Sequence, residues 1–169
     1  MRVPLAAAAL VSLWAVAAAH ATRADAPAAR RDAQAGSSPP VTRSTWDRVY
    51  SDEQAKRGAG VYALRCTHCH GELLGGNGEE ATPLAGPAFL SAWDGSTLGA
   101  LFSRIRTTMP DDNPGTLGGQ EIADVMAYVL SVNKFPSGQA ELPHDSVQLQ
   151  QIRFQASKSH AVGRAQDGR

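Results

Sequence analysis

The feature that most restricts which fold this chain can adopt is a short segment that contains both of its cysteines, Cys66-Thr67-His68-Cys69-His70. Two thiols three residues apart and followed directly by a histidine form C-x-x-C-H, the pattern of c-type haem attachment. In that arrangement the thiols add to the two vinyl groups of the haem, and the histidine lies under the ring, where its imidazole can bind the iron. We therefore predict one covalently attached haem c, held by Cys66, Cys69 and His70.

Two other uses of the cysteine pair remain open. A C-x-x-C can be a redox dithiol, but that function is typical of a βαβ context, and the sequence shows no convincing strand pattern. A structural zinc site needs four ligands at ordinary spacing. The sequence has no second cysteine pair, and His144 and His160 are too far apart for an H-x₃₋₅-H arm. Haem attachment is favoured over both.

The N-terminus has the pattern of an export signal. Met1-Arg2 precedes an apolar run over residues 3–19, and small-residue A-x-A patterns end at Ala21 and Ala26. We predict a signal peptide over residues 1–21, cleaved after Ala21 or Ala26, and a periplasmic location without a membrane span after cleavage. An uncleaved membrane anchor is the alternative, because a span needs about 17–25 residues. Export suits haem attachment, which takes place outside the reducing cytosol.

The rest of the chain divides by composition into three parts. Residues 22–45 are rich in Ala, Arg, Ser and Pro without a period, which is typical of a disordered linker. Residues 46–136 hold the haem motif and the periodic apolar segments, so we expect one domain there. Residues 137–169 form a polar tail that we expect to be partly disordered. The 16 basic and 16 acidic residues balance, which gives no support for a nucleic-acid partner.

The segment before the haem motif predicts a helix that runs from Ser51 into Cys66. Ser51 and Gln54 have the spacing of a capping box, in which each side chain bonds to the backbone amide of the other residue. Gly58 and Tyr62 fall on the same face as Cys66. A glycine inside a helix costs roughly 0.5–1 kcal/mol relative to alanine. We therefore expect another backbone to approach closely at Gly58.

Two further helices are predicted after the motif. One opens at Ser96 or Thr97 and has an apolar face at i, i+3, i+4 and i+7 spacing, formed by Leu98, Leu101, Phe102 and Ile105. The last runs from about Gly118 to Asn133, with a buried face formed by Ile122, Val125, Met126 and Val129. Before them, residues 71–95 form a loop rich in glycine and proline without a helical period. We expect this loop to wrap one edge of the haem.

Residues around the haem can also be proposed from the sequence. A ligated histidine needs an acceptor for its other ring nitrogen. We predict a backbone carbonyl near Pro87 for His70, because proline fixes the chain direction and cannot compete as a donor. Arg104 or Arg106 could pair with a haem propionate, and a solvated helix face is the alternative for each.

Met109 is the predicted ligand on the opposite face of the iron. Met1 leaves with the signal peptide, and Met126 lies on an apolar stripe where a core position is expected. Met109 instead ends a helix before a proline, where its thioether can be directed at the iron. The competing donors are three histidines, His68, His144 and His160. We expect His68 to point outward, and the other two lie in or near the polar tail.

In this order, the segments resemble a class I cytochrome c over residues 46–136. In that family the first and last helices cross at a glycine and an aromatic residue. The matching positions are Gly58 and Tyr62 in the first helix, Ala127-Tyr128-Val129 in the last, Cys66, Cys69 and His70 at the attachment site, and Met109 at the distal position. The resemblance implies an all-α cytochrome c fold, with three to four helices and glycine-rich loops around one covalently attached haem.

Two longer strings, over residues 106–117 and 128–136, are similar to bacterial cytochromes c that accompany periplasmic dehydrogenases, including quinoprotein alcohol dehydrogenases. One departure is visible at the N-cap of the last helix, where relatives often have Ser or Thr and this chain has Gly118. Glycine is only a few tenths of a kcal/mol poorer there, so we expect the helix to form.

The resemblance implies an electron carrier with His and Met axial ligands, not an enzyme. Its donor would be a periplasmic dehydrogenase, with this chain either a separate carrier or the cytochrome subunit of that enzyme, and its acceptor would be a downstream cytochrome or oxidase. The alternatives are a haem enzyme, such as a small peroxidase, and a haem-based redox or gas sensor. Both would require Met109 to be absent from the iron or displaceable.

Overall fold

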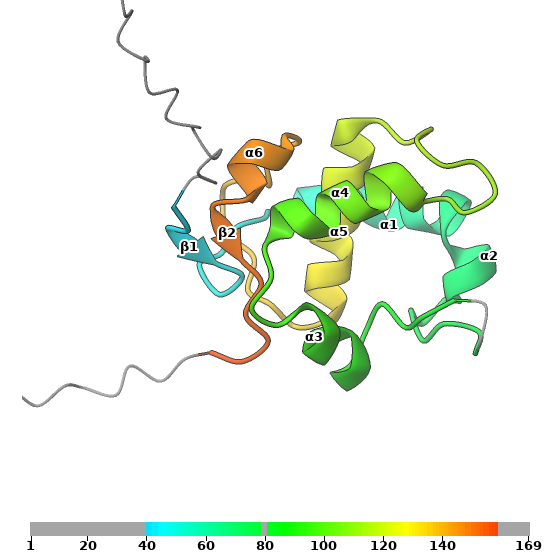
Figure 1. Cartoon of the computed structure of the whole chain (residues 1–169), viewed down its shortest axis with the longest axis horizontal. Coiled ribbons are helices and arrows are strands. Elements are labelled where there is room, and N and C mark those ends of the chain that lie inside the picture. Colours follow the sequence, from blue (N-terminus) through cyan, green and yellow to red (C-terminus); the bar gives the residue numbers. More distant parts are fainter. Residues whose placement is uncertain (1–39, 79–80, 159–169) are drawn as a thin grey trace, which may run out of the picture. The chain divides into compact units, whose positions relative to one another are not determined.

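The crossing of two long helices organises the fold (Figure 1). The computed structural model describes residues 40–78 and 81–158. Helix α1 (Asp52–Arg65) packs against helix α5 (Gly119–Val132), and this is the most extensive contact between elements. An ideal Cβ on Gly58 would lie 1.8 Å from the carbonyl oxygen of Asp124. The predicted close approach at Gly58 is therefore confirmed, because only a glycine lets the two backbones come this near.

An aromatic pair continues the same crossing. The rings of Tyr62 on α1 and Tyr128 on α5 have centroids 5.3 Å apart and planes tilted by 56°. This tilted arrangement is one that aromatic pairs prefer. Met126 on α5 is fully buried, as predicted for a core position. The mostly helical cytochrome c fold is therefore present, with α1 and α5 crossing at a glycine and an aromatic residue, although the described residues form six helices where three to four were expected.

The caps of these helices differ in part from the prediction. The Ser51 hydroxyl accepts from the Gln54 backbone amide at 3.1 Å, which confirms half of the capping box. The other half is wrong, because the Gln54 side chain bonds to both backbone groups of Leu142. At α5, Gly118 is the N-cap, and the Glu121 carboxylate accepts from its backbone amide at 2.8 Å. That bond supports the helix start without a capping hydroxyl.

Three helices lie between α1 and α5. Helix α2 (Thr67–His70) is one turn that follows α1 directly, and α4 (Leu98–Thr108) opens at the predicted N-cap Thr97. Helix α3 (Pro87–Trp93) lies within the segment predicted as a loop, so that prediction is wrong for these residues. Proline at the first helical position and the buried Phe89 explain the helix. Seven residues are too few to display a clear apolar period.

The packed unit is wider than the predicted range 46–136. Strand β1 (Arg43–Ser44) pairs in parallel with strand β2 (Ile152–Arg153), and helix α6 (Ser146–Leu149) precedes β2. The apolar side chains of this C-terminal part are buried: Leu142, Leu149, Ile152 and Phe154. Residues 43–45 therefore belong to the domain instead of the linker, and much of the tail covers helices. The predicted signal peptide, residues 22–39 of the linker and residues 159–169 lie outside the described residues.

Within the described ranges, none of the helices has both the length and the apolar character needed to cross a bilayer.

Candidate haem site

The attachment motif forms a single helical turn that places its three side chains together. Cys66 ends α1 and also caps α2, and its carbonyl accepts from the amides of Cys69 at 3.2 Å and His70 at 2.9 Å. Residues at i, i+3 and i+4 share one face of a helix. Cys66, Cys69 and His70 are therefore presented on the same side. Both thiols are free; Cys66 is half-buried and Cys69 is exposed.

His70 is buried and held by a hydrogen bond through one ring nitrogen. Its Nδ1 lies 2.9 Å from the carbonyl oxygen of Thr82. A carbonyl can only accept, so Nδ1 must carry the proton. In the neutral imidazole, Nε2 then has the lone pair that an iron ligand requires, and this is the usual arrangement for a ligating histidine.

The acceptor predicted near Pro87 is wrong, because the carbonyl comes from Thr82. The loop after His70 folds back on itself: the Gly76 amide donates to the His70 carbonyl at 2.9 Å. A Cβ on Gly76, whose φ is +74°, would lie 2.3 Å from the carbonyl oxygen of Ala81. Glycine therefore permits the close approach that brings Thr82 back to the imidazole. This closure depends on backbone contacts that the local sequence does not reveal.

The thiol of Cys66 is chemically unlike that of a redox dithiol. Burial raises the pKa of Cys66 to about 11, and the neighbouring Cys69 adds to this rise, while Arg65 opposes it. Cysteines that act in redox C-x-x-C motifs have lowered pKa values, because the thiolate is the nucleophile. Cys66 is a neutral thiol at neutral pH. Cys66 therefore lacks the lowered pKa that the attacking thiolate of a redox dithiol needs.

Met109 lies on a separate element, at the end of α4. Its amide donates to the Ile105 carbonyl at 2.9 Å, its backbone is extended, and its side chain is half-buried. The peptide bond to Pro110 is cis. The segment that follows is tied to the end of α1, because Arg65 donates to the Thr116 hydroxyl at 2.9 Å. That bond holds the Met109 loop to the residue directly before Cys66.

The other candidates are spread over the surface. His68 is exposed, as predicted, and the same is true of His144, Arg104 and Arg106. His160 lies outside the described residues. No group of three or more His, Cys, Asp or Glu side chains in residues 40–78 and 81–158 is placed to hold a metal ion. Of the groups considered, haem c best fits these donors: Cys66 and Cys69 would hold it covalently, and His70 Nε2 would bind its iron.

Asn133 is a residue of the site region that the sequence prediction missed. It caps the C-terminus of α5, and its side-chain oxygen accepts from the Gly86 amide at 3.0 Å. Its side-chain nitrogen donates to the carbonyls of Leu84 at 2.9 Å and Val129 at 2.8 Å. Asparagine at a helix end was the available signal. Its partners in the loop could not be predicted, because they are distant in sequence.

We expect Asn133→Ala to lower the free energy of unfolding by about 1–3 kcal/mol, because the Gly86 amide and the Leu84 carbonyl lose their partner, while the Val129 carbonyl keeps its bond from the backbone amide of residue 133. Denaturant unfolding measures this change. Asn113→Ala, at an exposed loop position, is the matched control and should change stability by less than about 0.5 kcal/mol. Equal effects of the two substitutions would contradict the role assigned to Asn133.

Two comparisons with known proteins found a match. Residues 53–129 match the family model described as cytochrome C oxidase, cbb3-type, subunit III. The solved sulfane dehydrogenase SoxCD from Paracoccus pantotrophus contains a chain that matches at 20% identity and a TM-score of 0.42. The match covers 61% of this chain and 59% of the SoxCD chain. No curated protein matches the sequence.

The family match spans the elements that carry the site. Residues 53–129 include the attachment turn, the Met109 position and most of the α1–α5 crossing. The helical fold, the free cysteine pair and the oriented histidine agree with the same family. Residues 53–129, a little under half of the chain, therefore form a cytochrome c domain that resembles the class I cytochromes c.

Proposed function

We propose that this chain is an exported, single-haem electron carrier with His70 and Met109 as axial ligands. The observation that carries the proposal is the bond from His70 Nδ1 to the Thr82 carbonyl. It leaves Nε2 free on the same helical turn as the only two cysteines of the sequence. One short segment therefore provides both the thiols for covalent attachment and the imidazole nitrogen for axial ligation.

The residues of the chain set what the haem can do. Haem c supplies one-electron chemistry, and a His/Met pair raises its reduction potential. The thioether of Met109 is a soft donor that favours the reduced iron. With both His70 and Met109 bound to the iron, no position would be left for peroxide or oxygen. This supports electron transfer over the peroxidase and sensor alternatives.

Exposed apolar side chains next to the attachment turn support transient docking. Leu64 is 84% exposed and Leu73 is 87% exposed, and they flank the turn in the sequence. Arg65 and Glu72 add one charge of each sign beside them. Weak electron-transfer complexes use small interfaces. A partner surface that is apolar and nearly neutral would fit this part of the chain.

The partner proposal rests on the sequence resemblance described above. Residues 106–117 and 128–136 are similar to cytochromes c that accompany periplasmic dehydrogenases. We therefore propose such a dehydrogenase as the electron donor, with a cytochrome or oxidase further along the respiratory chain as acceptor. The balanced charge of the chain is compatible with a protein partner of this kind.

Mass spectrometry of the protein exported from a host competent in cytochrome maturation tests the proposal. We expect the mass of the chain without its leader plus one haem. The oxidised protein should show a far-red sulfur-to-iron charge-transfer band. Cys66→Ala should reduce haem retention during export. A folded but colourless product would overturn the cofactor, and high-spin iron that readily binds external ligands would favour a haem enzyme or sensor.

A further inference from the structure

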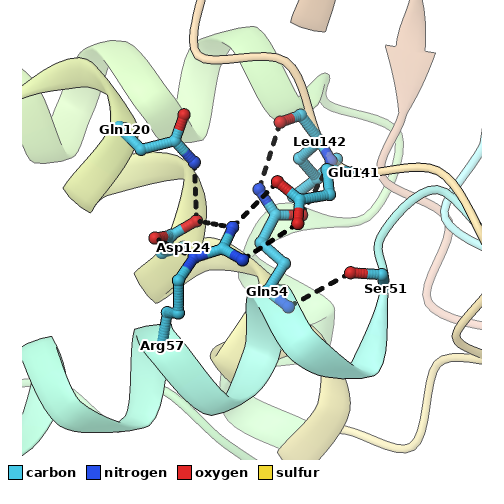
Figure 2. Close-up of polar contacts among 7 residues, drawn as sticks. All are labelled: Ser51, Gln54, Arg57, Gln120, Asp124, Glu141 and Leu142. Atoms are coloured by element: carbon cyan, nitrogen blue, oxygen red, sulfur yellow. Dashed lines mark hydrogen bonds and ion pairs between the residues drawn. The ribbon is translucent and has the colours of Figure 1, made fainter.

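The C-terminal segment 138–156, here called the strap, is bound at one end to the α1–α5 pair (Figure 2). The Gln54 side chain donates to the Leu142 carbonyl at 3.1 Å and accepts from the Leu142 amide at 2.7 Å. Gln54 is fully buried. Gln54 thus bonds to both the N–H and the C=O of Leu142, as a residue of a neighbouring β-strand would, and these two bonds hold the strap against α1.

An ion-pair bridge lies beside this anchor (Figure 2). Arg57 on α1 bonds to both carboxylate oxygens of Asp124 on α5 at 3.0 Å. The same guanidinium bonds to Glu141 of the strap at 2.8 and 2.9 Å. Glu141 is exposed, so this bond is expected to contribute little by itself. The buried Gln54 pairing is the stronger of the two anchors.

The other part of the strap is bound to α4 and to the turn before it. The Thr97 hydroxyl, which also caps α4, donates to the Gln150 side chain at 2.6 Å. Phe154 exchanges backbone bonds with that turn: its amide donates to Ser96 at 2.9 Å, and its carbonyl accepts from Gly95 at 2.9 Å. Leu149 and Phe154 of the strap are fully buried. The start of α4 is therefore fixed by polar and apolar contacts together.

Gly99 lets the strap lie directly on α4. An ideal Cβ at this position would be 2.7 Å from the Ser146 carbonyl oxygen and 2.8 Å from two carbons of the Gln150 side chain. The Gln150 side chain could move, but the Ser146 backbone would have to shift. Helix α4 packs more extensively against α6 of the strap than against α5. The strap is thus the main support of α4.

We infer that the strap positions Met109 as the distal ligand. This inference rests on the proposed His/Met ligation. Helix α4 ends at Met109, so the place of the helix sets the place of the thioether. The strap connects α4 to α1, and α1 leads directly into the attachment turn with His70. Gln54 and Gly99 are therefore positioning residues that act on the distance between the two ligand-bearing segments.

Gly99→Ala tests this inference, because it displaces the strap without removing any of its side chains. Alanine is a better helix former than glycine, so α4 itself should persist. Gly60→Ala on α1 is the matched control, since a Cβ there meets no atom within 4 Å. We expect haem attachment to be kept in both variants. In Gly99→Ala only, the far-red band should weaken and oxidised iron should bind added imidazole about tenfold more tightly, because apparent affinity follows the fraction of iron that Met109 has left.

Gln54→Ala tests the opposite anchor, with Glu141→Gln as its exposed control. The same loss of the far-red band and tighter imidazole binding are expected for Gln54→Ala, although α1 carries no distal ligand. If both Gly99→Ala and Gln54→Ala keep the wild-type band and imidazole affinity, the strap inference is overturned even if stability falls. A wild-type protein without the band would overturn the Met109 ligation itself, which separates the two failures.

Discussion

Replacing Met109 with alanine is expected to lower the reduction potential of the haem on the order of 0.1 V or more, within the roughly 0.8 V range that axial ligands set. The thioether favours Fe(II) over Fe(III), so its removal stabilises the oxidised state. The far-red band should disappear, and the iron should bind cyanide or imidazole at neutral pH. Redox titration and absorbance spectroscopy measure these changes. The haem should remain covalently attached, because Cys66, Cys69 and His70 are untouched.

Met126→Leu is the control for this experiment. Met126 is fully buried on α5, and a volume-conserving change in a core usually costs less than about 1.5 kcal/mol. Potential and spectrum should stay at the wild-type values. If Met109→Ala keeps a low-spin spectrum with an unchanged potential, another donor binds the iron. The histidines His68, His144 and His160 would then be the residues to replace next.

The helical frame could be predicted because its signals are local. The apolar period and Thr97 N-cap of α4 lie within that helix or next to it, and they gave its start correctly. Gly58 was informative because a glycine inside a helix needs a reason, and the reason is the carbonyl of Asp124. The cysteine spacing likewise determines a one-turn geometry. Each of these signals lies within a short stretch of sequence, although the backbone that approaches Gly58 belongs to the distant helix α5.

Features that depend on distant residues could not be predicted in the same way. The acceptor for His70 is Thr82 and not a carbonyl near Pro87, because the loop closes through Gly76. Gln54 fulfils only half of the expected capping box, because Leu142 competes for its side chain. No local rule identifies that partner.

The C-terminal strap was underestimated for a related reason. Its apolar residues are few and irregularly spaced among polar ones, so the segment has neither a helix nor a strand period. Their burial comes from individual contacts with α4 and with β1, and not from a continuous apolar face. Composition therefore indicated a tail where the structure has a packed extension.

Gly58→Ala is expected to lower the free energy of unfolding by about 3 kcal/mol, at the upper end of the usual cost of overpacking. The added Cβ would lie 1.8 Å from the Asp124 carbonyl oxygen and 3.0 Å from the Tyr128 Cβ. Both obstacles belong to α5, so α1 and α5 must separate. Such a loss is a large part of the roughly 5–15 kcal/mol by which domains are stable. Denaturant unfolding of the haem-loaded protein measures it.

Gly60→Ala separates this clash from the effect of alanine on the helix. Gly60 is exposed on the same helix and its Cβ would meet nothing within 4 Å, so the substitution should stabilise the protein by up to about 1 kcal/mol. The two alanines are thus expected to change stability with opposite signs although they lie two residues apart. Equal midpoints for Gly58→Ala and Gly60→Ala would mean that α1 and α5 do not touch through their backbones. The attachment turn, which continues from α1, would then lack the support that this crossing gives it.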